Sequence, residues 1–404
     1  MLTISKPISA GQARAYHQEE FQNARSSYYT EVDKIRGEWH GQLAERWGLR
    51  GEVQEQHFTR LAEGQHPITG EQLVKYQTPR QYRNRDGDLI RTIEHRAGWD
   101  ATFSAPKSVS LTALVGGDTR IREAHRESVD RALNDLEKYV QARMGGNAAA
   151  VSTGAWVAAK FEHDSSRPVA GYVAPQLHTH VVFFNLTERE NGEIRPLQPR
   201  ELYRTQQYAT AIYRAELALR LREMGYETVR GHSGAPEIRG YSAEYLEASS
   251  PRRQQIQAHL AEQGLSGAAA AQIAAHRTRD AKQVLTPAET LARHRELAAA
   301  YGNQPAHVIE AAKERAHSLH LDPGERLQQA QSAITFARDR NLEREAVVDE
   351  RALLRDALKR AMGLQARESN TLPALRRGQD LTLGEWSFLF GELLQATVPR
   401  VEDP

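Results

Sequence analysis

Three histidines are the most informative residues of this sequence. His178 and His180 lie in the run Pro-Gln-Leu-His-Thr-His-Val-Val-Phe-Phe, and His163 precedes the first of them by fifteen residues. The apolar end of this run predicts a strand, in which residues two apart project from one face. Three neutral imidazoles without a carboxylate leave coordination positions open on a metal ion, as catalytic sites require. The pattern predicts a metal centre, and the alternative is three ordinary core or surface histidines.

The segment before the pair has to bring His163 beside it. Residues 154–163 form a second strand-like run that ends on His163, and the polar connection over residues 164–175 contains Pro and Gly. Such a connection can return the chain as a neighbouring antiparallel strand. We therefore expect the three imidazoles to converge.

Tyrosines near the N-terminus supply candidate nucleophiles. Tyr16, Tyr28 and Tyr29 lie in a polar, charge-rich segment, where a tyrosine is more often a half-buried packing residue. A phenol with its ordinary pKa near 10 is a poor nucleophile. A divalent cation that withdraws charge from a scissile phosphate makes its attack feasible near neutral pH.

A third motif surrounds Asp100. Residues 99–103 read as a strand, Ser104 as a helix N-cap and Pro106 as a residue of the first helical turn. A helix N-terminus beside Lys107 is a natural phosphate-binding position. Asp100 is placed to hold a ligand histidine in one tautomer or to take a tyrosine proton, the alternative being a capping or ion-pair role.

Taken in order, these motifs resemble the relaxase domain of conjugative plasmid-transfer proteins of the MobF (TrwC/TraI-like) class, over about the first 300 residues. The resemblance implies an HUH endonuclease that nicks one DNA strand at the origin of transfer and stays joined to its 5′ end through a phosphotyrosine. It implies the following roles: Tyr16 as the principal nucleophile, Tyr28 and Tyr29 as the second tyrosine pair, Asp100 as the active-site acid, and His163, His178 and His180 as metal ligands.

The resemblance also implies a cofactor and partners. The metal would be Mg²⁺ or Mn²⁺, although imidazole ligands by themselves favour Zn²⁺, Ni²⁺, copper or iron. The partners would be single-stranded and hairpin DNA at the origin of transfer, relaxosome accessory proteins and the coupling protein of a type IV secretion system, with no membrane insertion.

Two features depart from the family pattern. The first tyrosine is followed by His17 rather than by a second tyrosine, and no Gly-x-x-x-x-Gly-Lys-Ser/Thr phosphate loop occurs, so helicase activity is not expected from these residues. Two rival functions remain open: a rolling-circle replication initiator with the same chemistry, and a non-catalytic single-strand-binding protein. The Ser-Ala-Pro-Lys-Ser-Val-Ser run and the region after the histidines favour the relaxase.

Composition agrees with a cytoplasmic nucleic-acid enzyme. The 404 residues include no cysteine, which excludes disulfides and thiolate chemistry, and 53 basic residues balance 52 acidic ones. No apolar run approaches the roughly 18 residues of a membrane helix, and the N-terminus lacks a signal-peptide core. A net charge of +1 decides little, because basic residues can still gather on one face.

The alternation of elements predicts an α+β fold, with helices packed on a central antiparallel sheet. Helices are expected over 10–48, 120–143, 203–224, 242–263, 330–338 and 347–362, and hairpins or loops over 71–96, 191–197 and 227–239. The predicted domains are a relaxase domain over 1–300, with 226–300 as a helical flap that closes over DNA, and a helical segment over 301–404. The candidate DNA contacts are Lys107, Arg230, Arg252, Arg253, Arg279 and Lys282, the last two matching the basic motif of the family's flap.

Overall fold

The computed structural model describes residues 1–15, 37–83, 89–231, 234–267, 270, 274, 286–316, 323–343 and 347–368. The chain divides into two compact units that are interleaved in the sequence. The first unit comprises Met1–Ala105, Leu133–Gln206 and Ala243–Tyr301, and the second comprises Pro106–Ala132, Gln207–Ser242 and Gly302–Pro404. The domain limits over 1–300 and 301–404 stay a prediction. None of the helices in the described ranges is both long and apolar enough to cross a bilayer.

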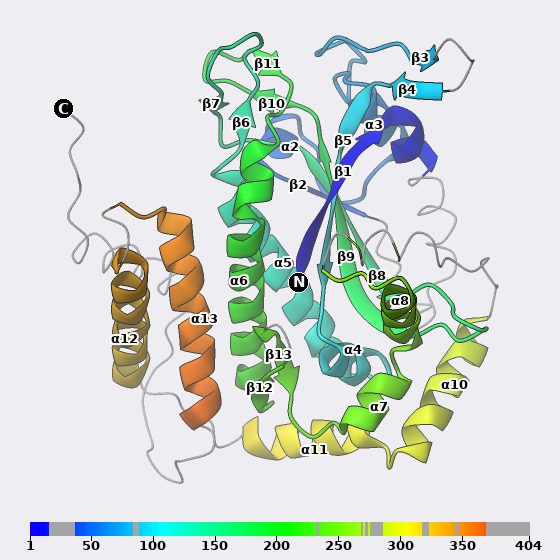
Figure 1. Cartoon of the computed structure of the whole chain (residues 1–404), viewed down its shortest axis with the longest axis vertical. Coiled ribbons are helices and arrows are strands. Elements are labelled where there is room, and N and C mark those ends of the chain that lie inside the picture. The colour runs from blue at the N-terminus through cyan, green and yellow to red at the C-terminus, as the bar shows by residue number, and fades with distance from the viewer. Residues whose placement is uncertain are drawn as a thin grey trace. The chain divides into compact units, whose positions relative to one another are not determined.

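A five-stranded sheet forms the centre of the first unit (Figure 1), and every neighbouring pair is antiparallel. Its strands in spatial order are β1 (Leu2–Ser9), β5 (Arg96–Ser104), β9 (Pro175–Phe184), β8 (Ala158–Ser165) and β2 (Glu38–His40). The apolar end of β9 is buried on both faces, which explains why this strand is central. The predicted antiparallel sheet with packed helices is confirmed.

One face of this sheet is divided between an apolar half and a polar half. On the apolar half, Phe58 of α3 (Glu55–Ala62) packs against Phe161 and Phe184, with ring centroids 6.1 and 5.0 Å apart. Phe161 pairs directly with His180, so the histidines lie on the same face, further along the strands. The core beneath α3 therefore holds the strand register that positions the histidines.

The pairing of β5 with β9 depends on a close backbone approach at Gly98. A Cβ at this position would lie 1.9 Å from the carbonyl oxygen of Phe183. Any side chain would separate the two strands only two residues before Asp100.

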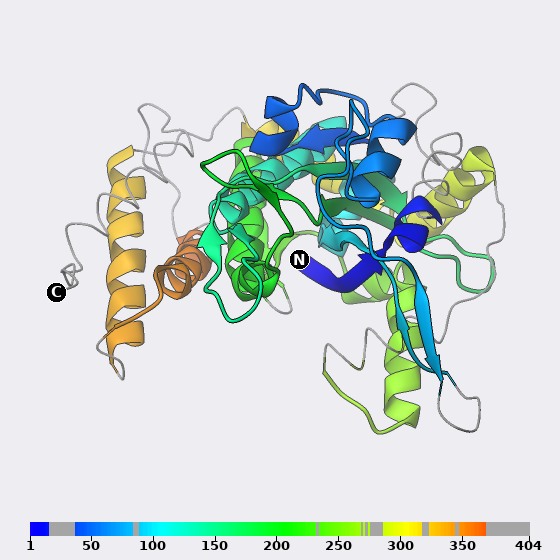
Figure 2. The ribbon, with the colours of Figure 1, turned by 90° about the horizontal axis from the view of Figure 1, so that it is seen from above.

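The first unit contains further short strands and helices. They are α2 (Gln42–Arg46), β3 (Arg80–Arg83), β4 (Leu89–Ile93), β6 (Gln141–Ala142), β7 (Val151–Ser152), β10 (Thr187–Glu188), β11 (Ile194–Arg195), α7 (Ala243–Ala248), α8 (Pro251–Glu262) and α10 (Pro287–Ala300). Strands β3 and β4 form a hairpin that extends away from the sheet (Figure 2).

The second unit is mostly helical. It contains α4 (Lys107–Leu114), α11 (Gln304–Ala316), α12 (Pro323–Leu342), α13 (Glu350–Glu368) and the hairpin of β12 (Thr228–Arg230) and β13 (Pro236–Ile238), while α5 (Thr119–Glu137) and α6 (Arg200–Glu223) contribute residues to both units. Helices α12 and α13 pack through Ile334 and Leu353 among small alanines.

Most predicted elements are confirmed, and three boundaries are wrong. Residues 38–40 form the edge strand β2 instead of a helix, because Trp39 pairs with Ala159 of β8 and tertiary pairing outweighs local propensity. Ser104 is the last residue of β5, and the helix begins at Lys107 with Pro106 as its N-cap. The helix predicted to reach residue 143 ends at residue 137. The helix that precedes Gly225 and the two later hairpins are confirmed.

Glu137 offers a test of the first unit's stability. Its side chain is 4% exposed, and Oε1 accepts the backbone N–H groups of Gln42 and Trp156 at 2.8 and 2.9 Å. Burial raises the pKa of this carboxyl from 4.5 to about 7. Above pH 7 the folded protein therefore carries a buried charge, whereas below pH 4.5 both the folded and unfolded forms are neutral.

We expect Glu137→Gln, which keeps the acceptor oxygen, to raise the free energy of unfolding at pH 8 by about 2–3 kcal/mol. The gain should shrink toward zero as the pH falls to about 4.5, because the wild-type carboxyl then binds a proton. Urea unfolding at both pH values measures this, with the exposed Glu310→Gln as control. An equal gain at both pH values would contradict the ionisation argument.

Candidate active site

The three predicted histidines come together on β8 and β9. His163 pairs directly with His178 across the two strands, and Phe161 pairs with His180. The ring centroids lie 5.0 Å apart for His163 and His178, and 5.1 Å apart for each of the other two pairs. The nearly equilateral triangle follows from two features of the sequence, the His-x-His spacing and the antiparallel register.

Asp100 orients one of these rings. His180 Nδ1 lies 3.0 Å from both carboxylate oxygens of Asp100 and 3.2 Å from Thr102 Oγ1. A carboxylate only accepts, so Nδ1–H donates to it and the lone pair of the imidazole lies on Nε2. His180 and Asp100 are each 21% exposed, so the pair is shielded and yet accessible from solvent.

His178 is oriented in the same way by the backbone. Its Nδ1 lies 2.9 Å from the carbonyl oxygen of Gln176, which can only accept a hydrogen bond. The lone pair of this ring therefore also lies on Nε2. Two of the three rings thus keep the Nε2 lone pair available to coordinate a metal ion.

The ring positions and donor chemistry fit a metal ion. A metal–nitrogen distance of about 2.1 Å puts each centroid about 3.2 Å from the ion, so two imidazoles at about 105° have centroids about 5 Å apart. Within the described ranges, no group of three or more His, Cys, Asp or Glu side chains already has the arrangement of a complete metal site. The imidazoles would therefore have to rotate toward the ion as they bind it.

The predicted phosphate position at the start of α4 is already used by the chain, in the second unit. The backbone N–H of Ser108 donates to Glu237 Oε2 at 3.2 Å, and the Ser108 hydroxyl donates to the same oxygen. Burial lowers the pKa of the Lys107 ammonium to about 7, and the Glu237 carboxylate acts in the opposite direction. An internal carboxylate thus takes the place predicted for a phosphate.

The other candidates are placed as follows. Tyr16, Tyr28, Tyr29, Arg279 and Lys282 lie outside the described residues. Arg253 is exposed on α8, where Arg252 donates to Gln255, and Arg230 is exposed at the end of β12. The described structure therefore brings the histidines together with Asp100, and it shows Arg252 and Arg253 on α8 and Arg230 on β12 of the second unit.

The sequence reading missed one group of DNA-contact candidates, on β3. All four residues of this strand are exposed, and they alternate as Arg80-Gln81-Tyr82-Arg83. The exposed fraction of Tyr82 is 47%. The signal that could have found them is the mixture of arginine with an aromatic residue in a segment expected to form a hairpin.

A scan of family models matches residues 10–301 to the TrwC relaxase family. The chain belongs to this family. Its histidine triangle and Asp100 all lie within the matched residues.

Two curated relatives match the chain beyond the residues of the family model. The multifunctional conjugation protein TraI of Escherichia coli strain K12 is 33% identical over 395 residues, which cover 94% of this chain and 21% of TraI. A second Escherichia coli TraI is 34% identical with the same coverage. The chain spans about a fifth of the length of these curated relatives.

Solved structures of the conjugative relaxase TrwC have the same fold. A complex with oriT DNA has a TM-score of 0.64 at 32% identity, and a metal-bound complex has a TM-score of 0.63 at 32% identity. A complex with a 27-mer DNA that comprises the recognition hairpin and the cleavage site has a TM-score of 0.59 at 31% identity. Each covers 75% of this chain and 99% of the solved chain.

Proposed function

We propose that this relaxase-family protein nicks one DNA strand at a plasmid origin of transfer and transfers that strand, which starts conjugative DNA transfer. The observation that carries this proposal is the histidine triangle with its orienting aspartate, in a chain matched to the TrwC relaxase family. The solved TrwC complexes with oriT DNA support it. The same family match favours a relaxase over a replication initiator or a non-catalytic binder.

The proposed reaction is a transesterification. The Tyr16 oxygen attacks the scissile phosphorus in line, the bond from phosphorus to the 3′ oxygen breaks, and a 5′-phosphotyrosine forms. The phenol gives up one proton and the leaving 3′ oxygen takes one up. Because one phosphodiester replaces another, rejoining the strand needs no ATP. Tyr28 or Tyr29 would serve a second cleavage once Tyr16 carries DNA.

We assign the metal ligands to His163, His178 and His180. A divalent ion bound there would polarise the scissile phosphate and offset the charge that develops on it. We propose Mg²⁺ or Mn²⁺, with Zn²⁺ or Ni²⁺ as alternatives that suit imidazole ligands. Asp100 holds His180 in the tautomer that binds a metal.

A nicking assay tests this function. The full chain is incubated with a labelled oligonucleotide that carries the origin of its plasmid, with Mg²⁺, with Mn²⁺ or with EDTA. We expect a cut strand and a protein–DNA adduct that resists denaturation, only with metal and only with the origin sequence. Binding without any cut strand, at every metal tested, would favour the non-catalytic alternative.

Asp100 provides a sharper test of the site. Loss of an orienting carboxylate typically costs about 10–100-fold in metal affinity or activity. We expect Asp100→Asn to slow cleavage by about this factor and to recover part of the loss at higher metal concentration. The matched control is Asp339→Asn, which removes an exposed partner of Arg338. Cleavage by Asp100→Asn at the wild-type rate would remove Asp100 from the site.

We propose that residues 226–300 include a flap over the bound strand. Support comes from α10, which attaches to the loop that leads into the histidine strand. Arg293 donates to the carbonyl of Gly171 at 2.7 Å, and the buried His294 lies 2.5 Å from the carbonyl of Val173. Helix α10, at the C-terminal end of residues 226–300, therefore lies beside the start of β9.

The basic motif of the flap is tested by salt dependence. If Arg279 and Lys282 contact the strand backbone, each change to Ala should weaken the binding of origin and scrambled single strands alike. The slope of log K against log salt should flatten by about 0.7 for each lost contact. Fluorescence anisotropy over a salt series measures this, and an unchanged slope would place the residue away from DNA.

The β3–β4 hairpin is proposed to contact the duplex part of the origin. Its first strand is exposed and carries Arg80, Tyr82 and Arg83, and a two-stranded ribbon fits the major groove of DNA.

We further propose that the protein acts in the cytoplasm with relaxosome accessory proteins and a type IV secretion coupling protein. The helices after residue 301 are candidates for contacts with these partners.

A further inference from the structure

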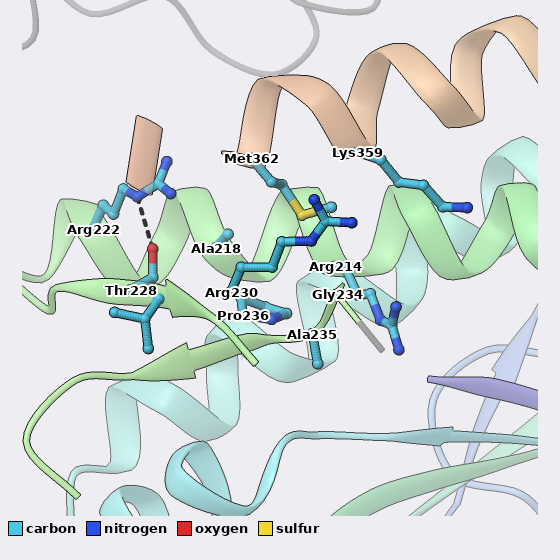
Figure 3. A pocket seen from close by; sticks show the side chains of 11 residues that line it. Arg214, Ala218, Arg222, Thr228, Arg230, Gly234, Ala235, Pro236, Lys359 and Met362 are labelled. Atoms are coloured by element: carbon cyan, nitrogen blue, oxygen red, sulfur yellow. Dashed lines mark hydrogen bonds between the residues drawn. The ribbon is translucent and has the colours of Figure 1, made fainter. Parts of the chain in front are cut away.

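A pocket in the second unit is lined by positively charged side chains from three elements (Figure 3). Arg214 and Arg222 come from α6, Arg230 from β12 and Lys359 from α13. None of the described residues that line it is acidic. Its volume of about 110 Å³ is below the roughly 300–1,000 Å³ typical of pockets for whole small-molecule ligands. Its size and charge therefore suit a single anionic group.

Two of the guanidinium groups lie close together beside the hairpin turn. A Cβ built on Gly234 would lie 3.5 Å from Arg230 Nε and 3.8 Å from Arg214 Nη1. Gly234 has a φ of +75°, a conformation that disfavours any other side chain. The turn thus permits both arginines to approach the same point.

The like charges of this cluster oppose one another. The pKa of Lys359 is lowered first by burial and then by Arg355, Arg214 and Arg230, while Asp356 acts in the opposite direction. The pKa of Arg214 is likewise lowered by burial and by Arg230, while Tyr213 and Glu237 act in the opposite direction. An anion placed among these groups would relieve the repulsion.

Two carboxylates that act on these cations also accept hydrogen bonds from groups outside the pocket. Asp356 accepts hydrogen bonds from Arg355 at 2.8 and 3.1 Å, and Glu237 accepts the N–H of Ser108. Neither belongs to the pocket lining. The lining of the pocket therefore contributes four cationic side chains and no carboxylate, while Asp356 and Glu237 act on these cations from outside the lining.

We propose that the pocket between α6, the β12–β13 hairpin and α13 is a phosphate-binding site. Arginine matches the geometry of a phosphate with two parallel donors, and lysine adds a point charge. Lys359 lies beyond residues 10–301, the part matched to the relaxase family, so the site needs the segment that follows. The phosphate comes either from the backbone of a single DNA strand, which rests on the proposed function, or from free phosphate.

The test uses the full chain and two variants that remove one cation each, Arg230→Gln and Lys359→Gln. The matched control is Lys313→Gln, which removes an exposed partner of Glu310 on α11. In the first arm, thermal unfolding is followed with inorganic phosphate and with chloride at equal ionic strength. We expect phosphate to raise Tm in the wild type and control, and both pocket variants to lose at least half of that rise.

The second arm distinguishes the source of the phosphate. Anisotropy of a labelled single strand without the origin sequence is measured over a salt series. A slope flattened by about 0.7 in both pocket variants, but not in Lys313→Gln, identifies the strand backbone. An unchanged slope together with a lost Tm rise identifies free phosphate.

Two results separate this proposal from the proposed function. Unchanged behaviour of both variants in both arms overturns the phosphate site, whether or not the wild type nicks DNA. Failure of the wild type to nick its origin, with the Tm effects intact, overturns the nicking function and leaves the phosphate site standing.

Discussion

Tyr16→Phe abolishes the first covalent protein–DNA adduct, with an expected loss of at least about 10³-fold, because the phenylalanine keeps the ring and deletes the attacking oxygen. Origin-specific binding should change little, since affinity is summed over many phosphate and base contacts. Denaturing gel analysis of a short labelled origin strand over time measures the adduct.

The comparison variant for this experiment is Tyr28→Phe. It should form the first adduct at close to the wild-type rate and fail in a second exchange by protein already loaded through Tyr16. Thermal unfolding of each variant establishes that the fold is kept. An adduct that persists in Tyr16→Phe and disappears in Tyr28→Phe would reverse the two assignments.

Loss of the metal, or of any of its three ligands, should have a comparably large effect. His163→Ala, His178→Ala, His180→Ala and treatment with EDTA are each expected to lower cleavage by at least about 10³-fold, because charge on the scissile phosphate is then no longer offset. Single-strand affinity should fall by less than about threefold, since the ion acts on one phosphate among many. Cleavage and anisotropy are measured on the same samples.

A matched histidine variant distinguishes a metal site from a structural role. His307→Ala changes an exposed histidine on α11 and should leave cleavage and binding unchanged. Adding Mn²⁺ in excess should restore EDTA-treated wild type and should not restore the variants. If binding falls as steeply as cleavage, the three histidines hold the fold together and do not hold a metal.

The sequence predicts that the three histidines converge because their geometry is local. The His-x-His spacing fixes one face of β9, and a short polar connection makes β8 its antiparallel neighbour, so His163 meets His178 directly. Asp100 joins them because β5 is the other neighbour of β9. The placement of these four residues follows from the alternation of side chains along each strand and from the pairing of neighbouring strands.

The features that sequence reading missed depend on contacts between distant segments. The three-residue strand β2 is defined by its partner β8 and has little strand pattern of its own. Glu237 reaches the start of α4 from a hairpin 129 residues away, and no local motif predicts this contact. The cationic pocket joins Arg214 to Lys359 across a similar separation. The tyrosines remain predictions, because they lie outside the described residues.

We propose that Tyr16 becomes covalently joined to the 5′ phosphate of the nicked strand. Mass spectrometry tests it most directly, after the wild-type chain has reacted once with an origin oligonucleotide and metal, followed by nuclease and protease digestion. We expect a nucleotide 5′-phosphate on the peptide that contains Tyr16, and none on that peptide when EDTA is present. A nucleotide found instead on Tyr28 or Tyr29, or cleavage without any modified tyrosine, would contradict it.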